Sequence, residues 1–92
     1  MNRYGAIARD HWKRWLPKRF EGISDPERFF SELGDEIASE VEVLADALAG
    51  DDSSAESYMD KLGRLNMARL RAEERVLQEL ALLQPEQEES SE

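Results

Sequence analysis

The chain has 92 residues and a net charge of −9, with 36% charged and 40% hydrophobic side chains and no cysteine. This composition excludes disulfides, thiolate metal sites and a cysteine nucleophile, and it predicts one small domain whose core is thin, because a chain of this length buries only roughly 60–65% of its unfolded surface. No stretch is apolar enough for a signal-peptide core or a bilayer span, so we expect a cytoplasmic protein without a membrane partner.

The first predicted helix covers residues 3–15. Its apolar side chains recur at spacings of three and four, which places them on one face of a helix. These side chains are Tyr4, Ile7, Ala8, His11, Trp12 and Trp15. Proline cannot continue a helix, so Pro17 ends this element and we expect a linker through Ile23.

The second predicted helix covers residues 25–49. Asp25 is a suitable N-cap, Pro26 fits the first turn, and Gly50 is a suitable left-handed stop. Gly34 interrupts the pattern and predicts a kink or a close helix contact. The apolar stripe consists of Phe30, Leu33, Ile37, Val41, Leu44 and Leu48.

The third predicted helix covers residues 54–83. Ser53 and Glu56 have the spacing of a capping box, and Pro85 ends the helix. The apolar face consists of Tyr58, Met59, Leu62, Leu65, Ala72, Val76, Leu77, Leu80 and Leu83. Residues 84–92 are polar and acidic, which predicts a disordered tail.

These elements predict an all-α domain over residues 1–83, in which two long helices form an antiparallel hairpin. The short aromatic helix can cover only one end of a hairpin of this length. The rest of the apolar stripe therefore lacks a partner, and homodimerisation into a four-helix-like bundle is the simplest way to bury it, although a different protein could occupy the same surface.

A basic and aromatic segment lies at residues 9–20, and its cations are Arg9, Lys13, Arg14, Lys18 and Arg19. Residues 1–19 carry six basic groups and one acid, whereas the remainder carries six basic groups and twenty acids. The basic segment can be interpreted as a contact surface for nucleic-acid phosphates and bases, or for an anionic membrane surface. The alternative, favoured by the shared face of Trp12, Trp15 and Tyr4, is that the aromatic rings are core and the cations are its solvated side.

A polar layer formed by Asn66, Arg69 and Glu73 interrupts the apolar stripe of the third helix. Arg69 and Glu73 are four positions apart and can pair, and Asn66 lies about one turn before them. Polar layers of this kind are typical of register or partner selection in helical bundles. A ligand or partner site built on Arg69 is the alternative.

The outer side of the second helix is acidic, with carboxylates at Glu32, Asp35, Glu36, Glu40 and Asp46. We expect a solvated face; the alternative is that these carboxylates imitate DNA phosphates and capture a nucleic-acid-binding protein. His11 is the only histidine, so the Glu-x-x-His pairs of a di-metal bundle cannot form within one chain. No glycine-rich phosphate loop or nucleophile motif is present, and we expect no metal, no cofactor and no enzymatic activity.

Three segments carry a family resemblance: Arg3-Tyr4-Gly5-Ala6-Ile7-Ala8-Arg9-Asp10-His11-Trp12, Asp25-Pro26-Glu27-Arg28-Phe29-Phe30 and Leu62-Gly63-Arg64-Leu65-Asn66-Met67-Ala68-Arg69-Leu70-Arg71-Ala72-Glu73-Glu74. Across nearly its whole length the chain resembles a group of small actinobacterial proteins, many of them transposon- or plasmid-encoded accessory proteins without an assigned activity. The resemblance implies a mobile-element or phage setting. It implies no functional residues.

The residues themselves favour a non-enzymatic helical interaction protein, dimeric and binding another protein through the exposed parts of its hairpin. Nucleic-acid binding through the basic segment, and a DNA-mimic inhibitor built on the acidic face, are the two alternatives.

Overall fold

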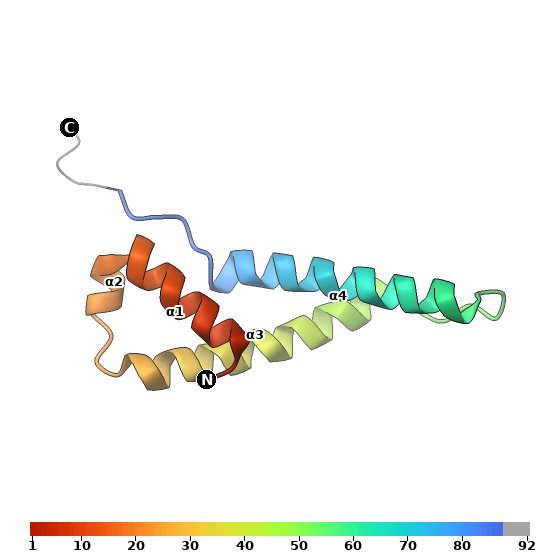
Figure 1. Cartoon of the computed structure of the whole chain (residues 1–92), viewed down its shortest axis with the longest axis horizontal. Coiled ribbons are helices and arrows are strands. Elements are labelled where there is room, and N and C mark those ends of the chain that lie inside the picture. The colour runs from red at the N-terminus through yellow and green to blue at the C-terminus, as the bar shows by residue number, and fades with distance from the viewer. Residues whose placement is uncertain (88–92) are drawn as a thin grey trace.

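The computed structural model describes residues 1–87, and in this range the chain forms four helices and no strand. The helices are α1 (Arg3–Trp15), α2 (Pro17–Glu21), α3 (Pro26–Ala49) and α4 (Tyr58–Leu80). Helices α3 and α4 pack antiparallel as a hairpin, and α1 lies against them at the end where they diverge (Figure 1). The predicted all-α hairpin with a short covering helix is therefore confirmed.

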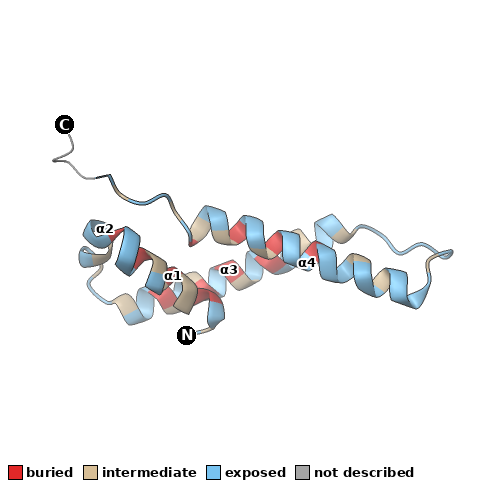
Figure 2. Cartoon of the chain, turned by 45° about the horizontal axis from the view of Figure 1, so that its top comes forward, coloured by how far each residue is buried: buried red, intermediate tan, exposed pale blue. Residues whose placement is uncertain are grey.

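The molecule is elongated, with extents of 59 × 32 × 16 Å. Its radius of gyration is 17.1 Å, whereas a compact domain of this length has a radius of gyration of about 12 Å. Figure 2 shows that buried residues gather where α1, α3 and α4 meet, whereas the loop end of the hairpin is largely exposed. Only two helices are present at that end, so their outer sides have nothing to pack against.

The aromatic core fixes α1 to the start of α3. The Trp12 ring contacts Phe30 edge-on with 5.4 Å between centroids, and the Phe20 ring stacks on Phe30 with 5.9 Å between centroids. Trp12 is buried, and its indole nitrogen Nε1 donates a hydrogen bond to the Ala81 carbonyl at 2.9 Å. The prediction that Trp15 shares this core is wrong, because Trp15 is exposed and lies under the Arg14 guanidinium.

The two glycines Gly5 and Gly34 let α1 and α3 approach backbone to backbone. A Cβ atom on Gly34 would lie 2.8 Å from the backbone nitrogen of Gly5 and 2.9 Å from its Cα. It would also collide with the side chain of Asn2, which caps α1 by accepting a hydrogen bond from the Gly5 N–H at 2.9 Å. Of the two predicted roles of Gly34, a close helix contact is the one found.

The predicted linker after Pro17 is wrong, because residues 17–21 form α2. Pro17 ends α1 but occupies the first position of α2, where its missing N–H costs nothing. The Glu86 carboxylate accepts hydrogen bonds from the backbone N–H groups of Lys18 and Arg19 at 3.2 and 3.0 Å. A negative group at this position also complements the helix dipole.

The start of α4 differs from the predicted capping box at Ser53 and Glu56. The Glu56 carboxylate instead accepts two hydrogen bonds from Arg64, at 2.8 and 3.0 Å. Both partners of this two-bond contact are charged, whereas the backbone N–H group of a capping box is neutral. The helix begins at Tyr58, and Ser57 caps it by accepting a hydrogen bond from the Asp60 N–H at 3.1 Å.

The end of α4 also comes earlier than predicted, at Leu80 instead of Leu83. The carbonyl groups of Ala81 and Leu83 turn toward α1, where Trp12 and His11 bind them.

Residues 84–87 of the predicted disordered tail are described, and the Glu86 N–H donates to the Trp15 carbonyl at 3.0 Å. That part of the tail prediction is wrong, and residues 88–92 lie outside the described residues.

The glycine crossing predicts a difference between two Gly→Ala variants. Gly34→Ala should lower the free energy of unfolding by about 1–3 kcal/mol, because the new methyl group overpacks the α1–α3 contact and displaces the α1 cap. Gly63→Ala is the matched control, since nothing lies within 4 Å of its added Cβ. It should raise stability by about 0.5–1 kcal/mol through helix propensity.

Urea denaturation followed by far-UV circular dichroism, at one fixed protein concentration, measures both values. Shifts of the two variants in the same direction would contradict a backbone contact at Gly34.

Candidate functional site

A polar junction ties α1 to the middle of the hairpin and consists of Arg3, Tyr4 and Glu73. The Tyr4 hydroxyl donates a hydrogen bond to the Glu73 carboxylate at 2.6 Å, and the Arg3 guanidinium contacts the same oxygen at 2.6 Å. The Glu73 side chain is only 16% exposed, so these contacts are shielded from water on the α4 side. Every buried side-chain nitrogen and oxygen in the described part of the chain has a hydrogen-bond partner.

The junction shifts two pKa values. The hydrogen bond from Tyr4, with that from Arg3 and its charge, lowers the pKa of the Glu73 carboxyl below its usual 4.5 despite partial burial. Burial and the hydrogen bond to Glu73 raise the pKa of the Tyr4 phenol above its usual 10. Over the ordinary range of pH, Glu73 therefore stays ionised and accepts the hydrogen bond, and Tyr4 stays neutral and donates it.

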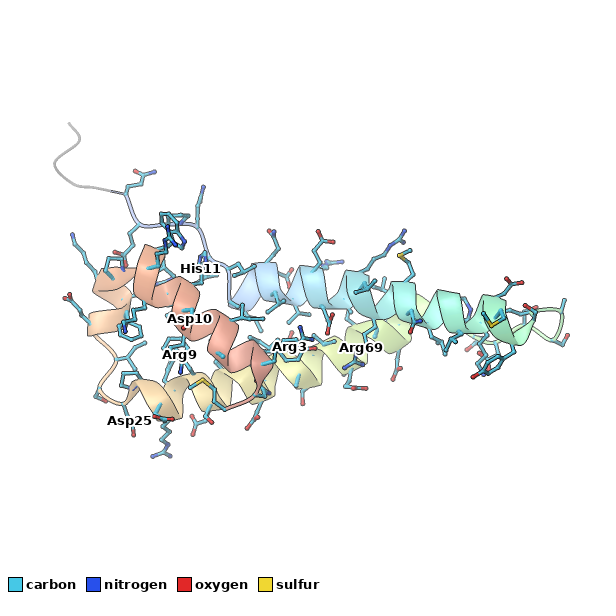
Figure 3. The ribbon with its side chains drawn as sticks, viewed as in Figure 1. Arg3, Arg9, Asp10, His11, Asp25 and Arg69 are labelled. Carbon is cyan, nitrogen blue, oxygen red and sulfur yellow. The ribbon has the colours of Figure 1, made fainter. Side chains whose placement is uncertain are left out.

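The three residues of the predicted polar layer, Asn66, Arg69 and Glu73, have different surroundings in the structure. Glu73 binds α1, so the predicted pair of Arg69 with Glu73 is wrong, and Arg69 instead forms an ion pair across the hairpin with Glu42 at 3.3 Å. Figure 3 shows Arg3 and Arg69 at the place where the N-terminal end of α1 meets the hairpin. Asn66 is exposed and has no hydrogen bond from its side chain within residues 1–87.

An open apolar row continues beyond this junction toward the loop, and we call it the distal seam. It consists of Met59, Leu62, Asn66 and Leu70. At 100° per residue these positions lie within about 60° of the direction of Glu73 on α4, on the side where α1 docks. Met59 is 71% exposed and Leu70 61% exposed, so the distal half of this side is uncovered.

The α3 helix supplies small residues on the same side of the hairpin. Ala45 and Ala49 lie 11 and 15 residues after Gly34, which directs them within about 60° of it. Small side chains let a third helix approach closely, as Gly34 does for α1. The surface that binds α1 therefore continues past the N-terminal end of α1.

A second surface, which we call the interhelical groove, lies between α3 and α4. It has a volume of about 470 Å³, and its lining includes Val43, Ala47 and Val76 with the charged residues Glu40, Arg75 and Glu79. Val43 is nine residues after Gly34, and nine steps of 100° turn it to the opposite side of α3. The interhelical groove therefore faces away from α1.

The basic segment is spread over α1 and α2 and does not form one cluster of free cations. Arg9 forms an ion pair with Asp10 at 3.2 Å. The guanidinium groups of Arg14 and Arg19 lie 4.9 and 5.8 Å from the ring centroids of Trp15 and Trp12. Lys13 is exposed, and Lys18 lies at the start of α2. Nucleic-acid binding by these residues stays a prediction.

The residues of the predicted acidic face of α3 are all exposed, namely Glu32, Asp35, Glu36, Glu40 and Asp46. Glu32 forms an ion pair with Arg28 at 3.1 Å. Within residues 1–87 no group of three or more histidine and carboxylate side chains is arranged to hold a metal ion. His11 is half-buried, and its Nε2 lies 2.7 Å from the Leu83 carbonyl, as expected for a structural histidine (Figure 3).

None of the four helices in the described part of the chain is long and apolar enough to cross a membrane. No family model, no curated protein and no solved structure matches the chain significantly. The resemblance to actinobacterial mobile-element proteins accordingly stays a prediction. The surfaces themselves, the distal seam and the interhelical groove, are the basis for inferring function.

The lowered pKa of Glu73 predicts an acid-dependent loss of stability. The carboxylate form is favoured in the folded chain, so its contribution is fully present above pH 4.5 and is lost as the pH falls through the lowered folded pKa. Glu73→Gln should lower the free energy of unfolding by about 1–3 kcal/mol at pH 7. Below pH 4.5 its stability should depend less on pH than that of the unmodified chain.

Denaturation curves between pH 7 and pH 3 measure this difference. Glu74→Gln is the control, because Glu74 is exposed and makes no hydrogen bond or ion pair within residues 1–87. If the stability of Glu73→Gln depended on pH in the same way as that of the unmodified chain, the assignment of this carboxylate as the anchor of α1 would be contradicted.

Proposed function

We propose that this protein is a non-enzymatic helical interaction module, which binds an amphipathic helix of another protein along the distal seam. The single observation that carries the proposal is the uncovered row of Met59, Leu62 and Leu70 on the side of the hairpin that already binds α1. Apolar side chains left in a row at helical spacing are typical of helix-in-groove recognition.

The packing of α1 supports a helix as the ligand. α1 reaches the hairpin through small residues, with Ala8 fully buried and Gly5 against Gly34. Beyond the N-terminal end of α1, Ala45 and Ala49 on α3 provide a similar surface of small side chains beside the apolar residues of α4. A helix of the partner would lie on this surface end to end with α1.

Asn66 would lie inside such a contact. Polar residues in an otherwise apolar helical interface are a documented means of selecting register and partner. A helix with a polar side chain opposite Asn66 would satisfy its amide, and a helix without one would leave the amide buried and unpaired, at a cost of about 1–3 kcal/mol. In this proposal Asn66 determines specificity, and Arg69 and Glu73 hold the surface in place.

Electrostatics favour a partner with basic residues at the edges of its helix. From residue 20 to the C-terminus the chain carries twenty acids and six basic groups. Such a body attracts cations and speeds association, although rim charges add little to affinity. Within the mobile-element setting that the sequence resemblance implies, the module would act as an accessory or regulatory protein.

Site-specific photo-cross-linking tests the proposal. The full chain, carrying a photoreactive amino acid at position 66, is expressed in an actinobacterial host, and the same residue at Glu36 on the outer side of α3 is the control. A cross-link to a protein other than a second copy of this chain should appear from position 66 only. That protein is then purified, and its direct binding to the unmodified chain is measured.

The double variant with Met59→Glu and Leu70→Glu should weaken this binding at least about tenfold, because the loss of a central apolar contact typically costs more than 1 kcal/mol. Both positions are exposed, so the fold should survive, which circular dichroism checks. Val43→Glu is the matched control on the opposite face and should leave this binding unchanged. Binding that tolerates both seam substitutions would refute the proposal.

A further inference from the structure

We infer that the interhelical groove is a self-association surface, and that a second copy of this chain packs into it in antiparallel orientation about a twofold axis near Val43. The groove lies on the face opposite the distal seam, so this inference is independent of the proposed partner. It concerns how two copies would stack to form the four-helix arrangement.

The first argument is the thinness of the hairpin on this face. The shortest extent of the molecule is 16 Å, and no element among residues 1–87 covers the groove. Val43, an aliphatic side chain that lines the groove, is 71% exposed. Domains normally bury such a face against a second layer, and a second hairpin supplies one.

The second argument is that the apolar lining extends toward the loop. A smaller hollow of about 180 Å³ lies nearer the loop and is lined by Leu48, Met67 and Ala68 together with Arg64 and Arg71. Met67 is exposed there. The two hollows lie one after the other on this face, since Ala47 lines the groove and Leu48 lines the second hollow, and an elongated surface of this kind suits another helical hairpin better than a small ligand.

The third argument is charge, which selects the occupant and its direction. Arg75 also lines the groove and forms an ion pair with Glu79 at 3.7 Å, so Glu40 carries the uncompensated negative charge of the groove. Arg71 borders the hollow toward the loop end. In the described part of the chain neither Glu40 nor Arg71 forms a hydrogen bond or an ion pair. A twofold axis near Val43 reverses the second copy, so Glu40 of each copy approaches Arg71 of the other.

This pairing is self-complementary, as an isologous interface requires, because each contact occurs twice. A parallel arrangement would instead place Glu40 near Glu40 of the second copy and Arg71 near its Arg71, which is unfavourable. The acidic body as a whole opposes association of two copies, so the local pairing of opposite charges is needed at this interface.

Sedimentation velocity of the full chain between 1 and 100 μM tests the inference. The unmodified chain should approach twice its mass of 10.6 kDa at the upper concentrations. Val43→Glu should raise the dissociation constant of the dimer at least about tenfold, and Leu70→Glu, an exposed residue on the opposite face, should leave it unchanged. Circular dichroism checks that each variant keeps its helices.

A charge exchange tests the antiparallel pairing. Glu40→Arg and Arg71→Glu should each weaken the dimer, and the variant carrying both should recover most of the affinity, because each copy then presents the reversed pair. A monomer at 100 μM, a dimer insensitive to Val43→Glu, or no recovery in the double variant would overturn the inference. An unmodified chain that stays monomeric but still binds its partner at the distal seam would overturn this inference and leave the proposed function standing.

Discussion

The close approach of α1 to α3 at Gly5 and Gly34 determines how the rest of this molecule is arranged. Because neither residue has a Cβ atom, the two backbones meet directly, and α1 lies deep enough for Trp12 to reach both Phe30 and the Ala81 carbonyl. The same depth brings the Tyr4 hydroxyl within hydrogen-bonding distance of Glu73. The close contact between Gly5 and Gly34 thus lets three helices pack together, and the aromatic core and the polar junction both depend on it.

The position of this contact also decides which surfaces remain open. α1 is 13 residues long, about 20 Å at 1.5 Å per residue, whereas α3 has 24 residues and is about 36 Å long. Since α1 docks at one end, the loop half of the hairpin has no third helix and keeps its apolar side chains in water. The stability of one end and the exposed residues of the other end therefore have a common cause.

The two open faces differ in a way that suggests separate uses. The distal seam continues the docking surface of α1 and has the polar residue Asn66 within its apolar row, an arrangement suited to selecting a particular helix. The opposite face has Glu40 in the interhelical groove and Arg71 in the hollow nearer the loop, an arrangement that suits a reversed copy of itself. A dimer built through the groove would present two distal seams on its outer sides, so self-association and partner binding are compatible.

Periodicity by itself determined the helical class, the ranges of α1 and α3, the Asp25 cap and the presence of a close contact or kink at Gly34, because these depend on residues near one another in the chain. Tertiary structure decided the features in which distant residues compete for the same groups. The Glu56 carboxylate binds Arg64 and not the predicted cap. The carbonyl groups after the end of α4 bind Trp12 and His11. The Glu73 carboxylate binds Tyr4 and Arg3 and not Arg69. Spacing along one helix shows which side chains can meet, but only the packing of separate helices decides which of those possible partners each charge obtains.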